Sequence, residues 1–295
     1  MLQFEELVPE IYLLKTPFAS LWSGVFLLRG EENILVDSGA GAEVVDEVIL
    51  PALERMNVEK NSIKWLINTH THGDHAYGNT RLLEATGAKL ATFDKGVDKL
   101  KNPLYYSRET RAAFPAYSSK APDYIPQVDT DVVVHDGMVL ADRVKIFSTP
   151  GHDTECISLL DLNTNSLLTG DSLQFGGTRS AAGSDIAYYK DLIEYRQTIE
   201  KISRIQPDNI FASHDYQPAG FCFYGREAVE NALRICTEVA DSYTMWVKEE
   251  LDRGVTDLAE LARMLLHKGG GEEGAYLFTD MYTAREHVKE ARSGR

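Results

Sequence analysis

The chain has 295 residues, of which 43% are hydrophobic, and it carries a formal net charge of −15 at pH 7. This apolar content is ordinary for a globular protein with a sizeable core, and the length allows one large domain or one domain with an appendage. A strongly acidic protein repels phosphate backbones, so we do not expect a nucleic-acid partner.

The N-terminus and the cysteines favour a cytoplasmic protein. Residues 1–6 are acidic and lack the apolar run of a signal peptide, and no stretch is long and apolar enough to span a bilayer. Cys156, Cys222 and Cys236 match no zinc or redox spacing, so we expect buried free thiols in a reducing compartment. These features predict a cytoplasmic chain with no membrane partner.

Up to residue 93 the chain predicts short strands and two helices. Apolar residues recur at three- and four-residue steps over residues 45–56, which predicts a helix with a kink or break at Pro51. A second helix is expected over residues 79–85, with Asn79 as its N-cap and Gly87 after its end. Apolar runs that are typical of strands lie at residues 11–14, 25–28, 34–36, 63–67 and 89–93.

Residues 94–130 show no clear periodicity but are rich in aromatic residues and prolines. A long segment of this kind in a compact domain is usually a lid or a binding loop. The alternative is an inserted helical patch that packs on the core or on a second subunit, which leaves a homodimer possible. The aromatic residues are Tyr105, Tyr106, Phe114, Tyr117 and Tyr124.

Strands resume after residue 131 and then give way to helices. A helix with an apolar face over residues 192–202 is closed by Pro207. From Gly225 onward the pattern is helical, beginning with one long amphipathic helix over residues 228–247. Further strands are expected at 132–134, 144–147, 157–160, 166–169 and 210–212, and shorter helices at 256–267 and 279–291.

The strongest chemical signal is the sequence Thr-His-Thr-His-Gly-Asp-His, which directly follows a predicted strand. Neutral imidazoles and carboxylates are suitable ligands for zinc and similar divalent ions. In an extended chain His70 and His72 project to the same side and can share one ion. Asp74 and His75 then lie on a turn, to which Gly73 gives conformational freedom, and can face a second ion.

Three further candidates, His152, Asp171 and His214, lie at the ends of predicted strands, where a rigid scaffold can aim a loop. Each is a weak signal alone, but with the histidine cluster they supply what two ions need. We expect no metal at the remaining histidines, which are His135, His267 and His287. For the tyrosines near these loops, ordinary packing is the better interpretation than donation to an oxyanion; they are Tyr188, Tyr189 and Tyr216.

As a set, these residues resemble the landmarks of the metallo-β-lactamase fold superfamily. The landmarks appear in order as Asp37 after an early strand, the histidine cluster, His152, Asp171 and His214. The resemblance implies an α/β (α+β) fold, an αββα sandwich with the metals at one edge. The catalytic domain would span residues 1–220, and residues 221–295 would form a helical C-terminal extension.

The resemblance also implies how the ligands are shared. Asp37 would orient the ligand loops rather than bind metal. Two divalent ions are expected, with zinc as the default and iron or manganese as alternatives that use similar ligands. One ion would be held by His70, His72 and His152, and the other by Asp74, His75 and His214, with Asp171 bridging both.

The expected reaction is hydrolysis. Two ions roughly 3.5–4 Å apart can hold a bridging hydroxide at neutral pH, and this hydroxide attacks an electrophilic carbonyl or phosphoryl centre. One ion would stabilise the oxyanion, and Asp74 would accept a proton from the nucleophile. We therefore predict a hydrolase of a small carbonyl ester, lactone or thioester, similar to glyoxalase II and the acyl-homoserine lactonases.

Other functions are possible on the same scaffold. One alternative is an iron-dependent redox protein or dioxygenase, and another is a phosphodiesterase. A non-catalytic binding module would predict that Asp171→Ala changes no activity, and the intact ligand set argues against it. The expected partner is a small-molecule substrate, whose identity depends on residues 94–130 and on the C-terminal helices.

Overall fold

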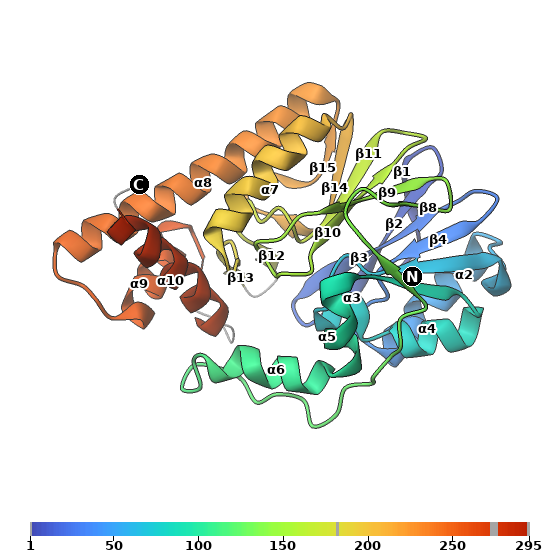
Figure 1. Ribbon diagram of the computed structural model, residues 1–295, viewed down its shortest axis with the longest axis horizontal. Coiled ribbons are helices and arrows are strands. Elements are labelled where there is room, and N and C mark those ends of the chain that lie inside the picture. Colours follow the sequence, from blue (N-terminus) through green and yellow to red (C-terminus); the bar gives the residue numbers. More distant parts are fainter. Residues whose placement is uncertain (1, 181–182, 272–276, 294–295) are drawn as a thin grey trace.

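A computed structural model describes residues 2–180, 183–271 and 277–293 and arranges them in four layers (Figure 1). Two β-sheets lie face to face in the middle, and helices cover the outer face of each. The predicted αββα sandwich with C-terminal helices is therefore confirmed. None of the helices among the described residues is long and apolar enough to cross a membrane.

The first sheet has seven strands in sequential order. The first four form an antiparallel meander, and the last four run parallel to one another. The carboxyl ends of the parallel strands therefore meet at one edge, where open α/β sheets bind their ligands. The strands are β1 (Glu5–Val8), β2 (Ile11–Phe18), β3 (Leu21–Leu28), β4 (Asn33–Val36), β5 (Ile63–Ile67), β6 (Lys89–Phe93) and β7 (Val132–Val134).

The second sheet has six strands in the order β15-β14-β11-β10-β9-β8. Only β11 and β14 are parallel, with Leu167 opposite Ile210 and Leu168 opposite Phe211. A separate short hairpin joins β12 (Arg179–Ser180) and β13 (Gly183–Ser184). The strands of the sheet are β8 (Val139–Leu140), β9 (Val144–Ser148), β10 (Ile157–Asp161), β11 (Ser166–Gly170), β14 (Asn209–Tyr216) and β15 (Gly220–Tyr224).

Helices form the two outer layers. One layer covers the first sheet and the other, which contains the long C-terminal helices, covers the second. The first layer comprises α1 (Ala42–Val44), η1 (Val45–Ile49), α2 (Leu50–Arg55), η2 (Lys60–Ser62), α3 (Gly73–Ala76), α4 (Asn79–Thr86), η3 (Asp94–Gly96) and α5 (Val97–Lys101). The helix α6 (Pro103–Ala112) lies outside this layer. The second comprises α7 (Leu192–Ile205), α8 (Arg226–Asp252), α9 (Leu258–Lys268) and α10 (Leu277–Ser293).

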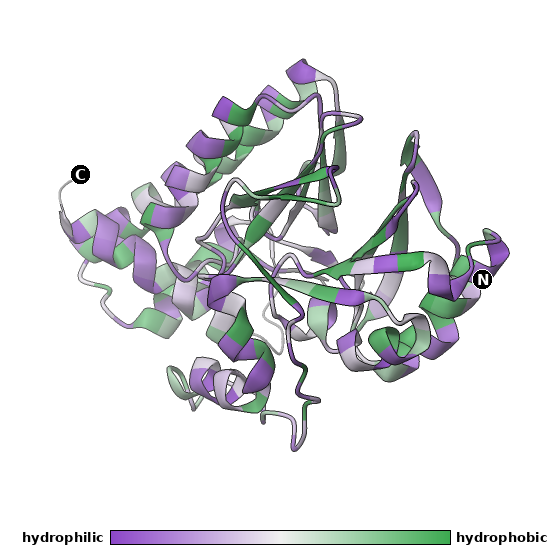
Figure 2. Ribbon diagram, turned by 45° about the vertical axis from the view of Figure 1, so that its right-hand side comes forward, coloured by the Kyte–Doolittle hydropathy of each residue, from purple (hydrophilic) through white to green (hydrophobic). Residues whose placement is uncertain are grey.

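Apolar side chains fill the space between the layers, which is the main source of stability for such a sandwich. The cluster between the sheets includes Phe26 and Ile34 from the first sheet and Ile146 and Phe211 from the second. Separate clusters join each sheet to its own helices. Figure 2 shows hydrophobic residues along the strands and alternating hydrophobic and hydrophilic bands along the long helices.

Two local expectations in the first half need correction. The predicted break at Pro51 is a change of helix type, because a π-helical turn, η1, passes directly into α2 and places the proline in its first turn. Asn79 is not an N-cap; Gly78 takes that position, and the Asn79 side chain instead exchanges hydrogen bonds with Asn68. Gly87 ends the helix in the left-handed conformation, as predicted.

The aperiodic segment after residue 93 is partly helical. It forms α5 and α6, and residues 113–131 follow without a regular helix or strand. No residue of α6 is fully buried, so this helix lacks the apolar stripe that reveals a helix in a sequence. The Tyr282 hydroxyl of α10 donates a hydrogen bond to the Thr110 carbonyl at 2.8 Å, so the segment packs on a C-terminal helix.

The C-terminal helices pack directly on the second sheet. Leu167 of β11, Val229 of α8 and Leu261 of α9 belong to one buried cluster. The expected division after residue 220 falls at the first residue of β15, which pairs with β14, and the helices begin at Arg226. The sheet thus extends four residues past that division, and the two parts share a core.

Candidate metal centre

All seven predicted ligands meet at one edge of the sandwich. His70, His72, Asp74 and His75 follow β5, His152 follows β9, and Asp171 follows β11. The parallel pairing of β11 and β14 brings Asp171 beside His214. The prediction placed His214 beyond a strand, whereas it lies inside β14, where the pairing register with β15 shifts. Such irregularities re-aim side chains near functional sites.

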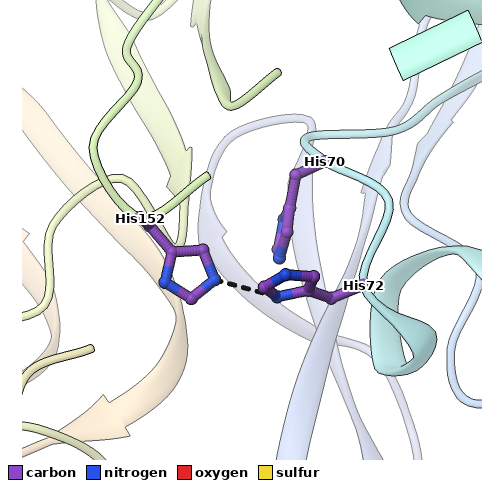
Figure 3. Close-up of side chains that lie close together, drawn as sticks. All are labelled: His70, His72 and His152. Atoms are coloured by element: carbon purple, nitrogen blue, oxygen red, sulfur yellow. Dashed lines mark hydrogen bonds between the residues drawn. The ribbon is translucent and has the colours of Figure 1, made fainter. Parts of the chain in front are cut away.

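Three imidazoles form the first group, which we call the imidazole triad: His70, His72 and His152. Their side chains point toward one another, with His152 reaching across from the opposite sheet (Figure 3). Nε2 of His152 lies 3.0 Å from Nδ1 of His72, and one nitrogen of each ring lies within 4.8 Å of the others. Burial and the neighbouring imidazole of His72 lower the pKa of His152 to about 4, so this ring is neutral.

Asp74, His75 and His214 form the second group, the carboxylate triad. Oδ2 of Asp74 lies 3.2 Å from Nε2 of both histidines. Burial opposes protonation of His214, but the carboxylates of Asp171 and Asp74 outweigh it and raise its pKa to about 10. Burial of Asp74 is likewise outweighed by the two histidines, and its pKa lies well below the usual value. This group therefore has a carboxylate-dominated field that favours a cation.

Asp171 lies between the two triads. One carboxylate oxygen, Oδ2, is 3.6 Å from Nε2 of His152 and 3.4 Å from Nε2 of His214. The other, Oδ1, is 3.6 Å from Nε2 of His75. A carboxylate shared in this way is suited to bridge two ions.

The imidazoles show that the cluster fits metal ions. In each ring, one nitrogen is engaged by an outer partner and the other faces the cluster, which is the arrangement of histidines that bind metal. Nε2 of His70 is buried and has no hydrogen-bond partner, so an ion would satisfy it. The outer partners are the Thr69 hydroxyl for His70, Asp153 for His72, Asp37 for His75, the Tyr188 carbonyl for His152 and the Trp22 carbonyl for His214.

Asp37 occupies the orienting position expected of it. It is fully buried and has a φ of 64°, a left-handed conformation that is uncommon outside glycine. Its carboxylate accepts hydrogen bonds from the backbone N–H of Thr69 at 2.7 Å and from the Thr69 hydroxyl at 2.8 Å, and it contacts Nδ1 of His75 at 2.8 Å. One carboxylate therefore positions the loop that holds the ligands after β5.

Two glycines permit close packing at the ligands. Gly73 does not provide a flexible turn, as the sequence suggested; it begins the short helix α3, and a Cβ there would lie 2.6 Å from the ring of Tyr77. Gly170, which precedes the bridging carboxylate, has a φ of 52°, and a Cβ there would lie 2.6 Å from Thr69. Any larger side chain at Gly170 would displace the residue that Asp37 holds.

A buried ionic group beside His72 was not anticipated from the sequence. Oδ2 of Asp153 lies 3.2 Å from Nε2 of His72, and this carboxylate accepts hydrogen bonds from Lys99 at 2.6 Å and from Lys190 at 2.5 Å. Lys99 also bonds Glu155, which in turn accepts from the Thr71 hydroxyl at 2.6 Å. The only sequence signal for this group is the position of Asp153 directly after the predicted ligand His152.

The neighbouring tyrosines have different roles. Tyr189 packs in the core and hydrogen-bonds His287, as the packing interpretation predicts. The Tyr216 hydroxyl instead donates to Oδ1 of Asp171 at 3.1 Å and thus holds the bridging carboxylate. Tyr188 stacks on His72, with 6.2 Å between the centroids of the two rings. Packing was therefore an incomplete interpretation for Tyr216.

The histidines outside the cluster join no potential ligand group among the described residues. His135 is exposed and lies 3.4 Å from Asp94. His287 is buried in the helical layer, where burial lowers its pKa to about 3.

A pocket of about 790 Å³ opens beside the ligand cluster. One wall carries five of the predicted ligands, which are His72, Asp74, His152, Asp171 and His214. The opposite wall comes from α6 and α10 and includes the aromatic side chains of Tyr106, Phe278 and Tyr282 among polar ones. A volume of this size accommodates a small organic molecule.

The chain is similar to known proteins in both sequence and fold. It is 30% identical over 191 residues to the Beta-lactamase-like protein 2 homolog of Drosophila melanogaster, a match that covers 63% of this chain and 55% of that relative. It is 26% identical over 216 residues to the hydroxyacylglutathione hydrolase of Pelagibacter ubique (strain HTCC1062), covering 68% of this chain and 76% of the relative. The chain thus spans little more than half the length of the Drosophila relative.

The fold likeness extends over nearly the whole chain. The crystal structure of a metallo-beta-lactamase family protein from Thermus thermophilus superposes with a TM-score of 0.71, covering 97% of this chain and 95% of that one at 19% identity. The family model of the metallo-beta-lactamase superfamily matches residues 23–214, which include every predicted ligand. The chain therefore belongs to the metallo-beta-lactamase superfamily.

Proposed function

We propose that the protein is a dinuclear metallohydrolase. The imidazole triad would hold one ion, the carboxylate triad a second, and Asp171 would bridge them. The observation that carries this proposal is the orientation of the five imidazoles, each with an outer partner and an inner nitrogen that faces the cluster. Zinc is the default occupant of such a ligand set, and iron and manganese are the alternatives.

Divalent ions bound there would supply Lewis acidity, which makes hydroxide available from water at neutral pH and polarises a carbonyl. The protein's own part is to position these groups. Asp74 faces the pocket, and we assign it the role of proton acceptor during attack. Tyr216 holds Asp171, and Asp37 holds the loop after β5.

The substrate class that we propose is a small carbonyl ester, lactone or thioester. Two observations support it. The pocket has room for a small molecule and exposes ligands of both triads to it. The similarity to a hydroxyacylglutathione hydrolase favours a thioester within that class.

The test is a hydrolysis panel on protein whose metal content has been measured. Thioesters, lactones, aryl esters and phosphodiesters would be assayed with the wild type and with Asp171→Asn. We expect close to two ions per chain and turnover of at least one carbonyl substrate, which Asp171→Asn abolishes while the protein stays folded by circular dichroism. Absence of turnover for every carbonyl substrate would reject the proposal. Iron content with oxygen consumption and no hydrolysis would identify the redox alternative, and turnover of phosphodiesters alone would identify a phosphodiesterase.

A further inference from the structure

The pocket wall opposite the ligands combines aromatic side chains with charge. α6 contributes Tyr106 and Arg111, and α10 contributes Phe278 and Tyr282. The two helices are joined by the hydrogen bond from Tyr282 to the Thr110 carbonyl. The aromatic rings suit an apolar part of a ligand, so its polar end depends on the charged groups of the wall.

Two cations that line this pocket already have carboxylate partners. Lys190 donates to Asp153 at 2.5 Å, and Lys99 donates to the same carboxylate at 2.6 Å and to Glu155. These ammonium groups are part of the ionic group that holds His72. They are therefore poorly suited to bind an anionic ligand.

Arg111 differs from both lysines. Among the described residues, no carboxylate forms a salt bridge with its guanidinium, although Glu109 lines the same pocket. Its Nε is buried and has no hydrogen-bond partner. Its Cζ lies 5.8 Å from the ring centroid of Phe278, so the guanidinium faces the aromatic wall.

The contacts that Arg111 does make leave Nη2 and the buried Nε without a hydrogen-bond partner among the described residues. Both of its hydrogen bonds to described residues use Nη1, which donates to the carbonyl of Ser107 at 2.9 Å and to the Ser107 hydroxyl at 2.8 Å. These bonds tie the side chain to its own helix one turn earlier, which is a structural role. They do not use Nε and Nη2, the pair of donors that grips both oxygens of a carboxylate.

We propose that Arg111 determines substrate specificity by binding a carboxylate of the substrate. An apolar segment of the substrate would lie against the aromatic wall, and the scissile carbonyl at its other end would reach the ligand cluster. The substrate class is thus an ester, lactone or thioester that also carries a carboxylate. This inference rests on the proposed hydrolysis at the same site.

The experiment compares matched substrates. Mono-p-nitrophenyl esters of dicarboxylic acids from succinate to adipate would be assayed beside neutral p-nitrophenyl esters of similar length. For the wild type we expect the best carboxylated ester to have a KM at least tenfold below that of its neutral counterpart, because a charged bidentate pair is worth roughly 10- to 100-fold in affinity.

Three variants separate binding from folding. In Arg111→Met the ratio of the KM values for the neutral and the carboxylated ester should fall toward one. For the carboxylated ester, KM should change more than kcat. Arg111→Lys keeps the charge but not the paired donors and should give an intermediate ratio. Arg108→Met, an exposed arginine on the same helix, is the control and should keep the wild-type ratio.

The outcomes distinguish the two proposals. If the wild type hydrolyses both kinds of ester without preference, or if Arg111→Met keeps the preference, the specificity role of Arg111 is wrong and hydrolysis stands. If neither ester is hydrolysed, the role of Arg111 can still be tested by measuring the affinity of the corresponding anilides, which resist hydrolysis, by calorimetry. A carboxylated anilide that binds the wild type no more tightly than the neutral one, or binds Arg111→Met equally well, would overturn the assignment.

Discussion

The two triads contain the same kind of side chain in opposite electrostatic states. In the imidazole triad, burial and neighbouring rings keep His152 neutral, with a pKa of about 4. In the carboxylate triad, Asp74 and Asp171 outweigh burial and raise the pKa of His214 to about 10. Residue type alone therefore does not set the charge of a metal ligand; the number of buried carboxylates beside it does.

This difference implies two ways of binding a cation. Burial lowers the pKa of His70 and of His152 in the imidazole triad, so an ion displaces no proton from these two rings. The carboxylate triad without an ion holds protons on its histidines, which an entering ion must displace. The following predictions test this contrast, beginning with the ligand that both triads share.

Removing the shared carboxylate should have the largest effect. Asp171→Ala takes a ligand from both triads and leaves the Tyr216 hydroxyl without its acceptor. We expect kcat to fall by more than ~100-fold, the upper end of what losing an outer partner of a metal ligand costs, and both ions to bind more weakly. Steady-state kinetics and metal analysis measure this, with exposed Asp208→Asn as the control. Near-normal activity would refute the bridging role.

Single-ligand variants should separate the triads. His152→Ala should reduce the metal content from two ions to one by emptying the imidazole triad, and His214→Ala should empty the carboxylate triad instead. Cobalt substitution with absorption spectroscopy distinguishes the two remaining sites, because three nitrogens and a mixed nitrogen and oxygen set give different spectra. Identical spectra for the two variants would contradict the division into triads.

Changes to the outer partners should have smaller effects. Asp153→Asn weakens the support of His72 in the imidazole triad alone. Asp37→Asn weakens the support of His75 directly and that of His70 through Thr69, so it acts on both triads. We expect each to reduce the affinity of the ion or ions concerned by roughly 10- to 100-fold, as is usual for such partners. Competition with a chromophoric chelator measures both affinities. Equal weakening of the two ions by Asp153→Asn would show that the triads are not supported independently.

The smallest effect concerns the pH dependence of stability in chelator-treated protein. The raised pKa of His214 contributes stability that is fully present below about pH 6.5 and is lost as the pH rises toward 10. The lowered pKa of His152 acts in the opposite sense, and stability is lost as the pH falls from about 6.5 toward 4.

Urea unfolding at several pH values tests this directly. Each histidine should change the free energy of unfolding by at most about 1.4 kcal/mol per pH unit. His214→Gln should flatten the curve on the alkaline side, and His152→Gln should flatten it on the acid side. The same curve for the wild type and both variants would contradict the assigned charge states.

Much of the ligand cluster could be predicted from the sequence, because ligands to a metal must be of a few residue types and must follow strands that meet at one edge. The outer partners of the imidazole rings could not be predicted in this way. Asp153, Lys99 and Lys190 come from three separate segments, and only the folded chain brings them together beside His72. The role of Tyr216 was hidden for the same reason, since its partner Asp171 lies on a neighbouring strand.

The fold, too, could be predicted from the sequence only in part. The apolar runs and the amphipathic helix over residues 226–252 have strong periodicity because each buries one face. α6 has no fully buried residue, so its sequence carries no such pattern, although the helix forms a wall of the pocket. The reason for a glycine at position 73 could not be predicted either. A side chain there would collide with the ring of Tyr77, whereas the backbone conformation of Gly73 itself does not require glycine.

The contact between α6 and α10 has a consequence for the order of events during synthesis. Every predicted ligand precedes α10 in the sequence, so the ligands are synthesised before this part of the pocket wall. The wall that holds Phe278 and Tyr282 is added afterwards and is fastened to the Thr110 carbonyl. The pocket is therefore completed only when the last helix has been synthesised and has packed against α6.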